Sequence, residues 1–268
     1  MFSKKDFQTW GKQNAILFAA VMTKIEGRKD DALLRTYEFR GFPSMAILDA
    51  DGTAMTKKVP RDLYSMSNIV AAAPAYAKLS AAIEAGNEVD QKQWLMAQLG
   101  MGRIKATEAK AKIASSGLSG KAKARADMMV FVLEMAELAG STRGRNVTAE
   151  DKMAACVAVY EAFQAGKRLP PGSSPEPFVD DMLIDAAKSN KDSVAFAHAC
   201  ERVKARHLAQ IKTMKGYLPR YRADLEKNKD DEKKLERTKS TLKRIAEIIE
   251  GAEQKIADLE TLAKKLNA

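Results

Sequence analysis

Two cysteines and two histidines carry the most readily recognised chemistry in this 268-residue chain. Cys156 and Cys200 lie in separate stretches of helical pattern, whereas a dithiol mechanism needs a second thiol beside the first. We expect both to be apolar packing residues. No Cys or carboxylate joins His198 and His207 at the spacing of metal ligands, and His207 falls on an apolar helical stripe. These residues therefore predict no metal site, no cofactor and no catalytic group.

Two further carboxylates, Asp49 and Asp51, follow an apolar run in the segment Ala46–Thr53, AILDADGT. The segment resembles the first motif of haloacid-dehalogenase-like phosphatases. The resemblance implies that Asp49 would attack phosphorus and that Asp51 would act as general acid or base. That fold needs alternating strands and helices after the motif, whereas this sequence becomes almost entirely helical. An Asp-Gly hairpin turn explains the same residues, so the phosphatase stands as a minor alternative.

The elements around this segment predict a small α/β unit. The run from Leu33 to Gly52 predicts a helix end, a rigid turn at Pro43, a buried strand from Met45 to Leu48 and then a hairpin. The apolar run Ala15–Val21 predicts a further strand. Together these segments resemble the C-terminal part of a thioredoxin domain, over about residues 2–83. The half of the domain that would carry the redox CxxC is not in this sequence.

The thioredoxin resemblance implies a binding site at Phe42 and Pro43. In that family the proline is cis, and the residue before it lines the groove that holds a substrate peptide. The resemblance therefore implies a protein or peptide partner, bound by strand addition. Without CxxC the chain is expected to be non-catalytic. The alternative is that it is a truncated thiol-disulfide oxidoreductase whose CxxC lies upstream of Met1.

Composition and charge limit the other functions. A content of 46% hydrophobic and 30% charged residues suits a soluble globular protein. No apolar run approaches the roughly 18 residues that span a bilayer, which predicts no membrane span. We expect a cytoplasmic protein, or a periplasmic or secreted one if an upstream signal peptide is missing. The net charge is +10, but charges alternate in sign along the C-terminal helices, which argues against nucleic-acid binding.

Beyond Pro60 the pattern is helical almost throughout. We predict a truncated thioredoxin-like domain over residues 1–85, a helical domain over 86–166, a Pro/Gly linker over 167–177 and a helical hairpin or coiled coil over 178–268. Within the helical part, Thr148 and Asp151 form a weak capping-box signal.

The last third of the chain carries a seven-residue repeat of apolar positions. Two series, three residues apart, recur over about five heptads, which predicts a coiled-coil seam. They comprise Leu235, Leu242, Ile249, Ile256 and Ala263, and Thr238, Ile245, Ala252, Leu259 and Leu266. A preceding stripe from Phe196 to Leu218 offers a partner within the same chain. We favour an antiparallel hairpin that turns at 228–231 over pairing with another chain, although a homo-oligomer through the coiled coil stays open.

The sequence therefore predicts an α/β thioredoxin-like, truncated N-terminal unit followed by an all-α region with a long C-terminal coiled-coil hairpin. Its predicted role is that of a binding or assembly protein.

Overall fold

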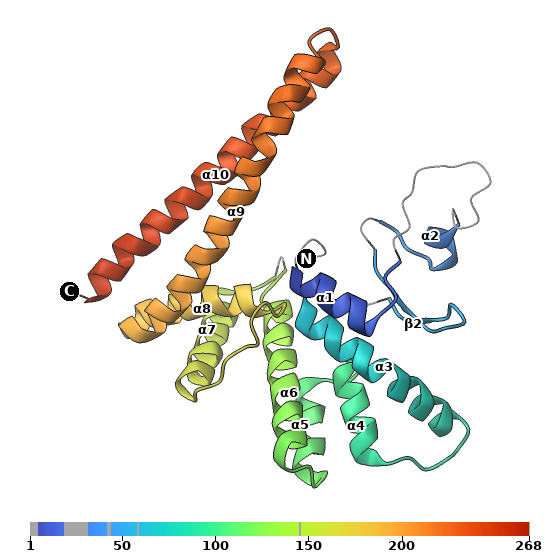
Figure 1. The fold of residues 1–268 in the computed structure, drawn as a ribbon. Coiled ribbons are helices and arrows are strands. Elements are labelled where there is room, and N and C mark those ends of the chain that lie inside the picture. Colours follow the sequence, from blue (N-terminus) through green and yellow to red (C-terminus); the bar gives the residue numbers. More distant parts are fainter. Residues whose placement is uncertain (1–4, 19–31, 42–43, 58, 145, 268) are drawn as a thin grey trace. The chain divides into compact units, whose positions relative to one another are not determined.

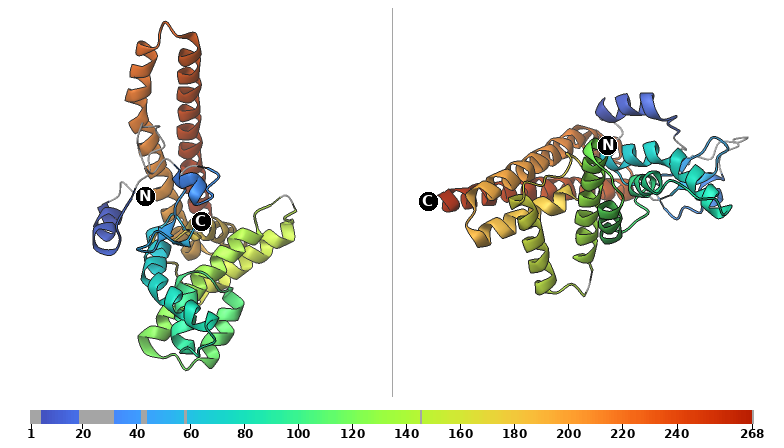
Figure 2. Two further views of the ribbon diagram at one scale, coloured as in Figure 1. Left: turned by 90° about the vertical axis from the view of Figure 1, so that its right-hand side faces the viewer. Right: turned by 90° about the horizontal axis from the view of Figure 1, so that it is seen from below.

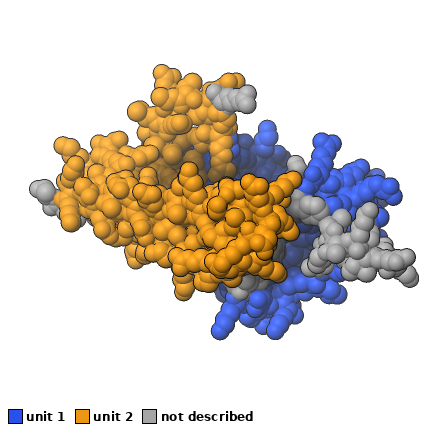
Figure 3. Space-filling view, turned by 90° about the horizontal axis from the view of Figure 1, so that it is seen from above, with its two compact units in different colours: residues 1–141, 169–176 blue, residues 142–168, 177–268 orange. Residues whose placement is uncertain are grey.

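The chain forms two compact units, and almost all of its regular structure is helical (Figure 1). The computed structural model describes residues 5–18, 32–41, 44–57, 59–144 and 146–267. Unit 1 comprises residues 1–141 and 169–176, and unit 2 comprises residues 142–168 and 177–268 (Figure 3). Ten helices and one two-stranded sheet lie within the described residues.

The predicted thioredoxin-like α/β fold is wrong. The sheet of the described residues holds only β1 (Ile47–Leu48) and β2 (Ala54–Thr56), which pair antiparallel as a hairpin. The predicted strand Ala15–Val21 is not a strand at residues 15–18, and residues 19–21 lie outside the described part. A thioredoxin sheet needs parallel strands buried between helices. Here Ile16 is fully exposed, and residues 15–18 belong to no sheet.

The hairpin itself was predicted correctly. Asp51 and Gly52 turn the chain between β1 and β2, and Gly52 adopts a φ of +87°, which favours glycine. The hydroxyl of Tyr37 donates a hydrogen bond to the carbonyl oxygen of Gly52 at 2.8 Å. Tyr37 follows the short helix α2 (Leu33–Thr36), so this bond ties the helix to the turn. A local hairpin thus accounts for the run that resembled a thioredoxin domain.

The core of unit 1 is made by four helices. α3 (Leu63–Glu84) packs against α4 (Gln91–Gly100), while α5 (Ala106–Ser115) packs against α6 (Gly120–Ser141). A Cβ added at Gly100 would lie 2.5 Å from the Cβ of Ala72, so the α3–α4 contact requires glycine there. The first helix, α1 (Lys5–Asn14), buries Phe7. α3 is continuous through Pro74.

Unit 2 begins with two helices of ordinary length. α7 (Ala149–Gln164) starts at the predicted capping box: Thr148 accepts a hydrogen bond from the Asp151 backbone N–H, and the Asp151 carboxylate accepts one from the Thr148 backbone N–H. α8 (Glu176–Asn190) follows the Pro/Gly-rich segment. Both helices bury apolar residues, among them Val159 and Leu183.

The rest of unit 2 is a long antiparallel helical hairpin. α9 (Ser193–Lys227) and α10 (Glu232–Asn267) are joined by a turn at 228–231, where the sequence predicted it. The two helices lie side by side along their length in both views of Figure 2. α9 is continuous through Pro219. The pairing lies within one chain, as the sequence favoured.

None of the helices in the described part of the chain is both long enough and apolar enough to span a bilayer.

Candidate functional site

The binding residues implied by the thioredoxin resemblance, Phe42 and Pro43, lie outside the described residues. The fold that gave them that role is not present, so the resemblance no longer supports a peptide groove there. The carboxylates of Asp49 and Asp51 serve the hairpin turn: each accepts a hydrogen bond from a nearby backbone N–H, that of Ala50 and that of Thr53. These bonds favour a structural role over that of a nucleophile and its acid.

Electrostatics at the turn also disfavours acid catalysis. The backbone N–H of Thr53 stabilises the ionised carboxylate of Asp51 and lowers its pKa from the ordinary value of 3.8. A general acid that works near neutral pH needs a raised pKa instead.

Neither cysteine resembles a redox nucleophile. Cys156 is half-buried, with its Sγ 3.6 Å from the Sδ of Met182, and Cys200 is buried. Burial raises the pKa of both thiols above the ordinary value of 9.0, which keeps them protonated at neutral pH. Both are free thiols. They pack as small apolar residues, in accordance with the expectation from sequence.

The most buried charge of unit 2 is Asp180 on α8, whose side chain is 1% exposed. Its Oδ1 lies 2.6 Å from Nη2 of Arg202, and its Oδ2 accepts a hydrogen bond from Nη1 of Arg206. Both arginines project from α9, one turn apart. Arg206 also contacts Asp181 at 3.1 Å. One carboxylate thus holds two guanidinium groups and fastens α8 to α9.

An aromatic and basic group adjoins this ion-pair cluster. Nη1 of Arg202 lies 3.2 Å from Nε2 of His198, and the His198 ring stacks obliquely on Phe163 with centroids 5.2 Å apart. The guanidinium of Arg168 lies 3.7 Å above the Phe163 ring. Burial, helped by the positive charges of Arg202 and Arg168, lowers the pKa of His198. The neutral ring can then accept a hydrogen bond from Arg202.

The ion pairs of this cluster favour a structural role over a catalytic one. Asp180 is held by two guanidinium groups, so it is poorly placed to accept a proton from a substrate. Among the described residues no group of three His, Cys, Asp or Glu side chains is placed to hold a metal ion. The ion pairs instead fix the base of the α9–α10 hairpin to the rest of unit 2.

The two heptad series predicted from sequence line the contact between α9 and α10. Thr238, Ile245, Ala252 and Leu259 are buried, and the companion series is half-buried. The facing residues of α9 alternate by four and three positions, in the order His207, Ile211, Met214, Leu218, Tyr221 and Leu225, and each is half-buried or buried. Lys204–Glu260 and Lys215–Glu253, at 2.5 and 3.2 Å, join the helices across the seam.

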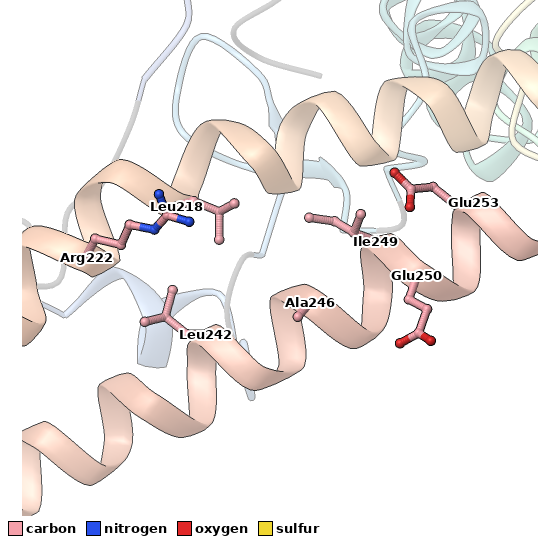
Figure 4. Close-up of a pocket in the computed structure, with 7 residues that line it drawn as sticks. All are labelled: Leu218, Arg222, Leu242, Ala246, Ile249, Glu250 and Glu253. Carbon is pink, nitrogen blue, oxygen red and sulfur yellow. The ribbon is translucent and has the colours of Figure 1, made fainter.

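Two open grooves follow one side of this seam. The first, of about 530 Å³, lies over the middle of the hairpin, and Figure 4 shows its lining of Leu218, Arg222, Leu242, Ala246, Ile249, Glu250 and Glu253. The second, of about 480 Å³, lies nearer the ends of the helices and includes Phe196, Leu208, Ala263 and Leu266. We name the side of the hairpin that carries these two grooves the groove face. The Lys215–Glu253 ion pair also lies on this side, because Glu253 lines the first groove.

Comparisons with known proteins identify no relative. No protein-family model matches the chain, and neither a curated protein nor a solved structure matches it.

Sequence reasoning found the seam but missed the ion-pair cluster. Asp180 follows a proline-rich segment, and Arg202 and Arg206 lie in the next helix. An i, i+4 arginine pair on a helix with an apolar stripe was the available signal, because two cations one turn apart can share one carboxylate.

Proposed function

We propose that this protein is a non-catalytic assembly protein, and that the groove face of the α9–α10 hairpin pairs with the same face of a second copy. The observation that carries the proposal is the open groove around Ala246. Two helices alone cover only part of each other's apolar stripe, so Leu218, Leu242 and Ile249 remain half-buried at its walls. A second hairpin laid on this face would complete a four-helix bundle.

The dimensions of the hairpin suit such an interface. A helix of 35 residues is about 50 Å long, and two helices side by side are roughly 20 Å wide. A face of that size offers on the order of 1,000 Å² per partner. This exceeds the roughly 800 Å² per partner of a standard specific interface.

The distribution of charge favours an antiparallel, two-fold arrangement. The distal half of the hairpin, residues 212–244, contains 12 Lys or Arg and 6 Asp or Glu, a net charge of +6. The proximal half of the hairpin, residues 193–211 and 245–268, contains 6 Lys or Arg and 6 Asp or Glu, a net charge of zero. A two-fold axis near Ala246 would place the basic half of one hairpin against the neutral half of the other, so that the two basic halves do not face each other.

Light scattering after size-exclusion chromatography tests this proposal. The wild-type chain should have twice the mass of one 29.4 kDa chain at about 100 μM. Ala246→Glu adds a charge and bulk at the exposed floor of the groove without touching the buried seam, so it should give the monomer with unchanged helicity. Ala223→Glu makes the same change at an exposed position of α9 that does not line either groove, and it should leave the dimer intact.

A wild-type monomer at this concentration would refute self-assembly through the hairpin. Equal loss of the dimer in both variants would show that charge, rather than the groove, governs association.

A further inference from the structure

The two grooves of the groove face are lined by charged side chains of two kinds. Lys204 and Glu253 are each bound across the seam to a residue of the neighbouring helix. Arg222 and Glu250 in the first groove and Glu201 in the second are exposed, and none of these three forms an ion pair within the described part of the chain. The groove face therefore presents charges of both signs that its own chain does not neutralise.

Two of these free charges, Glu201 and Arg222, occupy equivalent positions on α9. They lie three heptads apart, so each has the same placement relative to the seam. Along the helix axis they are about 30 Å apart, which is too far for an ion pair within one chain. The carboxylate lies near the base of the hairpin and the guanidinium lies in its distal half.

A two-fold, antiparallel arrangement of two hairpins would bring these opposite charges together. A two-fold axis that lies in the interface and runs across the hairpin reverses the direction of the helices, while it keeps α9 against α9 and α10 against α10. Such an interface is reciprocal: residue i of one copy meets residue j of the other, and j meets i. With the axis midway between the two positions, Arg222 of each copy faces Glu201 of the other.

Charges on α10 indicate the same axis. Lys243 lies seven residues before Glu250, at the same heptad position, and it too is exposed and forms no ion pair among the described residues. The midpoint of this pair lies between positions 246 and 247, and that of the α9 pair between 211 and 212. Both midpoints are about 16 residues from the turn at 228–231. One axis close to Ala246 therefore serves both helices.

We propose that Arg222 of one copy binds Glu201 of a second copy, and that this reciprocal ion pair sets the antiparallel register of the dimer. The inference rests on the proposed self-assembly. The distal part of α9 from the second copy would then cover the second groove, including Leu208, which is 56% exposed in the single chain. A guanidinium can bind a carboxylate with two parallel hydrogen bonds, so the pair favours one alignment of the helices over others.

Charge reversal followed by mixing tests the pair on the full-length chain, with the dimer measured by light scattering over a range of concentrations. Arg222→Glu places two carboxylates together at each of the two symmetric contacts, and Glu201→Arg places two cations there. Each variant alone should therefore raise the Kd of the dimer at least about tenfold. In an equimolar mixture of the two variants every contact again joins opposite charges. A heterodimer should then form with a Kd within about threefold of the wild-type value.

Arg220→Glu is the matched control. It makes the same change two residues from Arg222, at an outward position of α9 that lines neither groove, and it should change the Kd less than about threefold. Circular dichroism of each variant checks that the hairpin remains folded.

The outcomes separate this pairing from self-assembly itself. A wild-type monomer would refute self-assembly and the pair together. A wild-type dimer that survives both single reversals, or a mixture that stays monomeric, would refute the pair while self-assembly stands. Equal weakening by Arg220→Glu would show that net charge, rather than this contact, governs association.

Discussion

Substitution of Asp180 should reveal how strongly the ion-pair cluster holds the base of the hairpin. Asp180→Asn removes the negative charge while keeping the shape of the side chain. Arg202 and Arg206 then face each other without the carboxylate that now separates them. Breaking a buried ion pair costs about 3–5 kcal/mol. Because the two arginines are 27% and 34% exposed, water recovers part of this cost, and we expect a loss of about 3 kcal/mol in the free energy of unfolding.

The neighbouring residue provides the control. Asp181 forms an ion pair with Arg206, at 3.1 Å, and its side chain is 58% exposed. Asp181→Asn should therefore cost less than about 1 kcal/mol. Urea titration followed by circular dichroism measures both variants. With an m-value of about 3 kcal/mol/M, Asp180→Asn should lower the midpoint by about 1 M. Equal midpoints for the two variants would contradict the role that burial gives to Asp180.

Three other outcomes follow from the described contacts. His198 has a folded pKa below 6.5, so as pH falls below 6.5 the unfolded chain takes up a proton that the folded chain does not. The free energy of unfolding should then decrease, and His198→Gln should remove this component, as measured by urea titration between pH 7.5 and 5. Thr148→Ala removes the α7 cap and should cost about 1 kcal/mol, whereas an unchanged melting curve would contradict the capping box. Cys156 and Cys200, with raised pKa values, should react slowly with Ellman's reagent at pH 7.5 until urea unfolds the chain; fast labelling of the native protein would show that a thiolate is exposed.

Local patterns in the sequence were sufficient to predict the start of α7, the buried side of α10 and the hairpin between β1 and β2. Thr148 and Asp151 specified the start of α7 because a capping box forms between residues three apart. The heptad series specified which side of α10 is buried, since that periodicity belongs to the helix itself. The Asp51-Gly52 turn specified a hairpin for the same reason. Each of these features depends on residues close together in the chain.

Features that depend on distant partners were decided only by the tertiary structure. The apolar residues at 15–18 have the composition of a buried strand, but a strand needs neighbours, and the described chain provides none there. The role of Asp180 arose when α8 and α9 packed together and enclosed its charge between two arginines. The sequence by itself determined which residues each helix presents, and the packing of the helices decided which charges are buried and paired, as it did for Asp180.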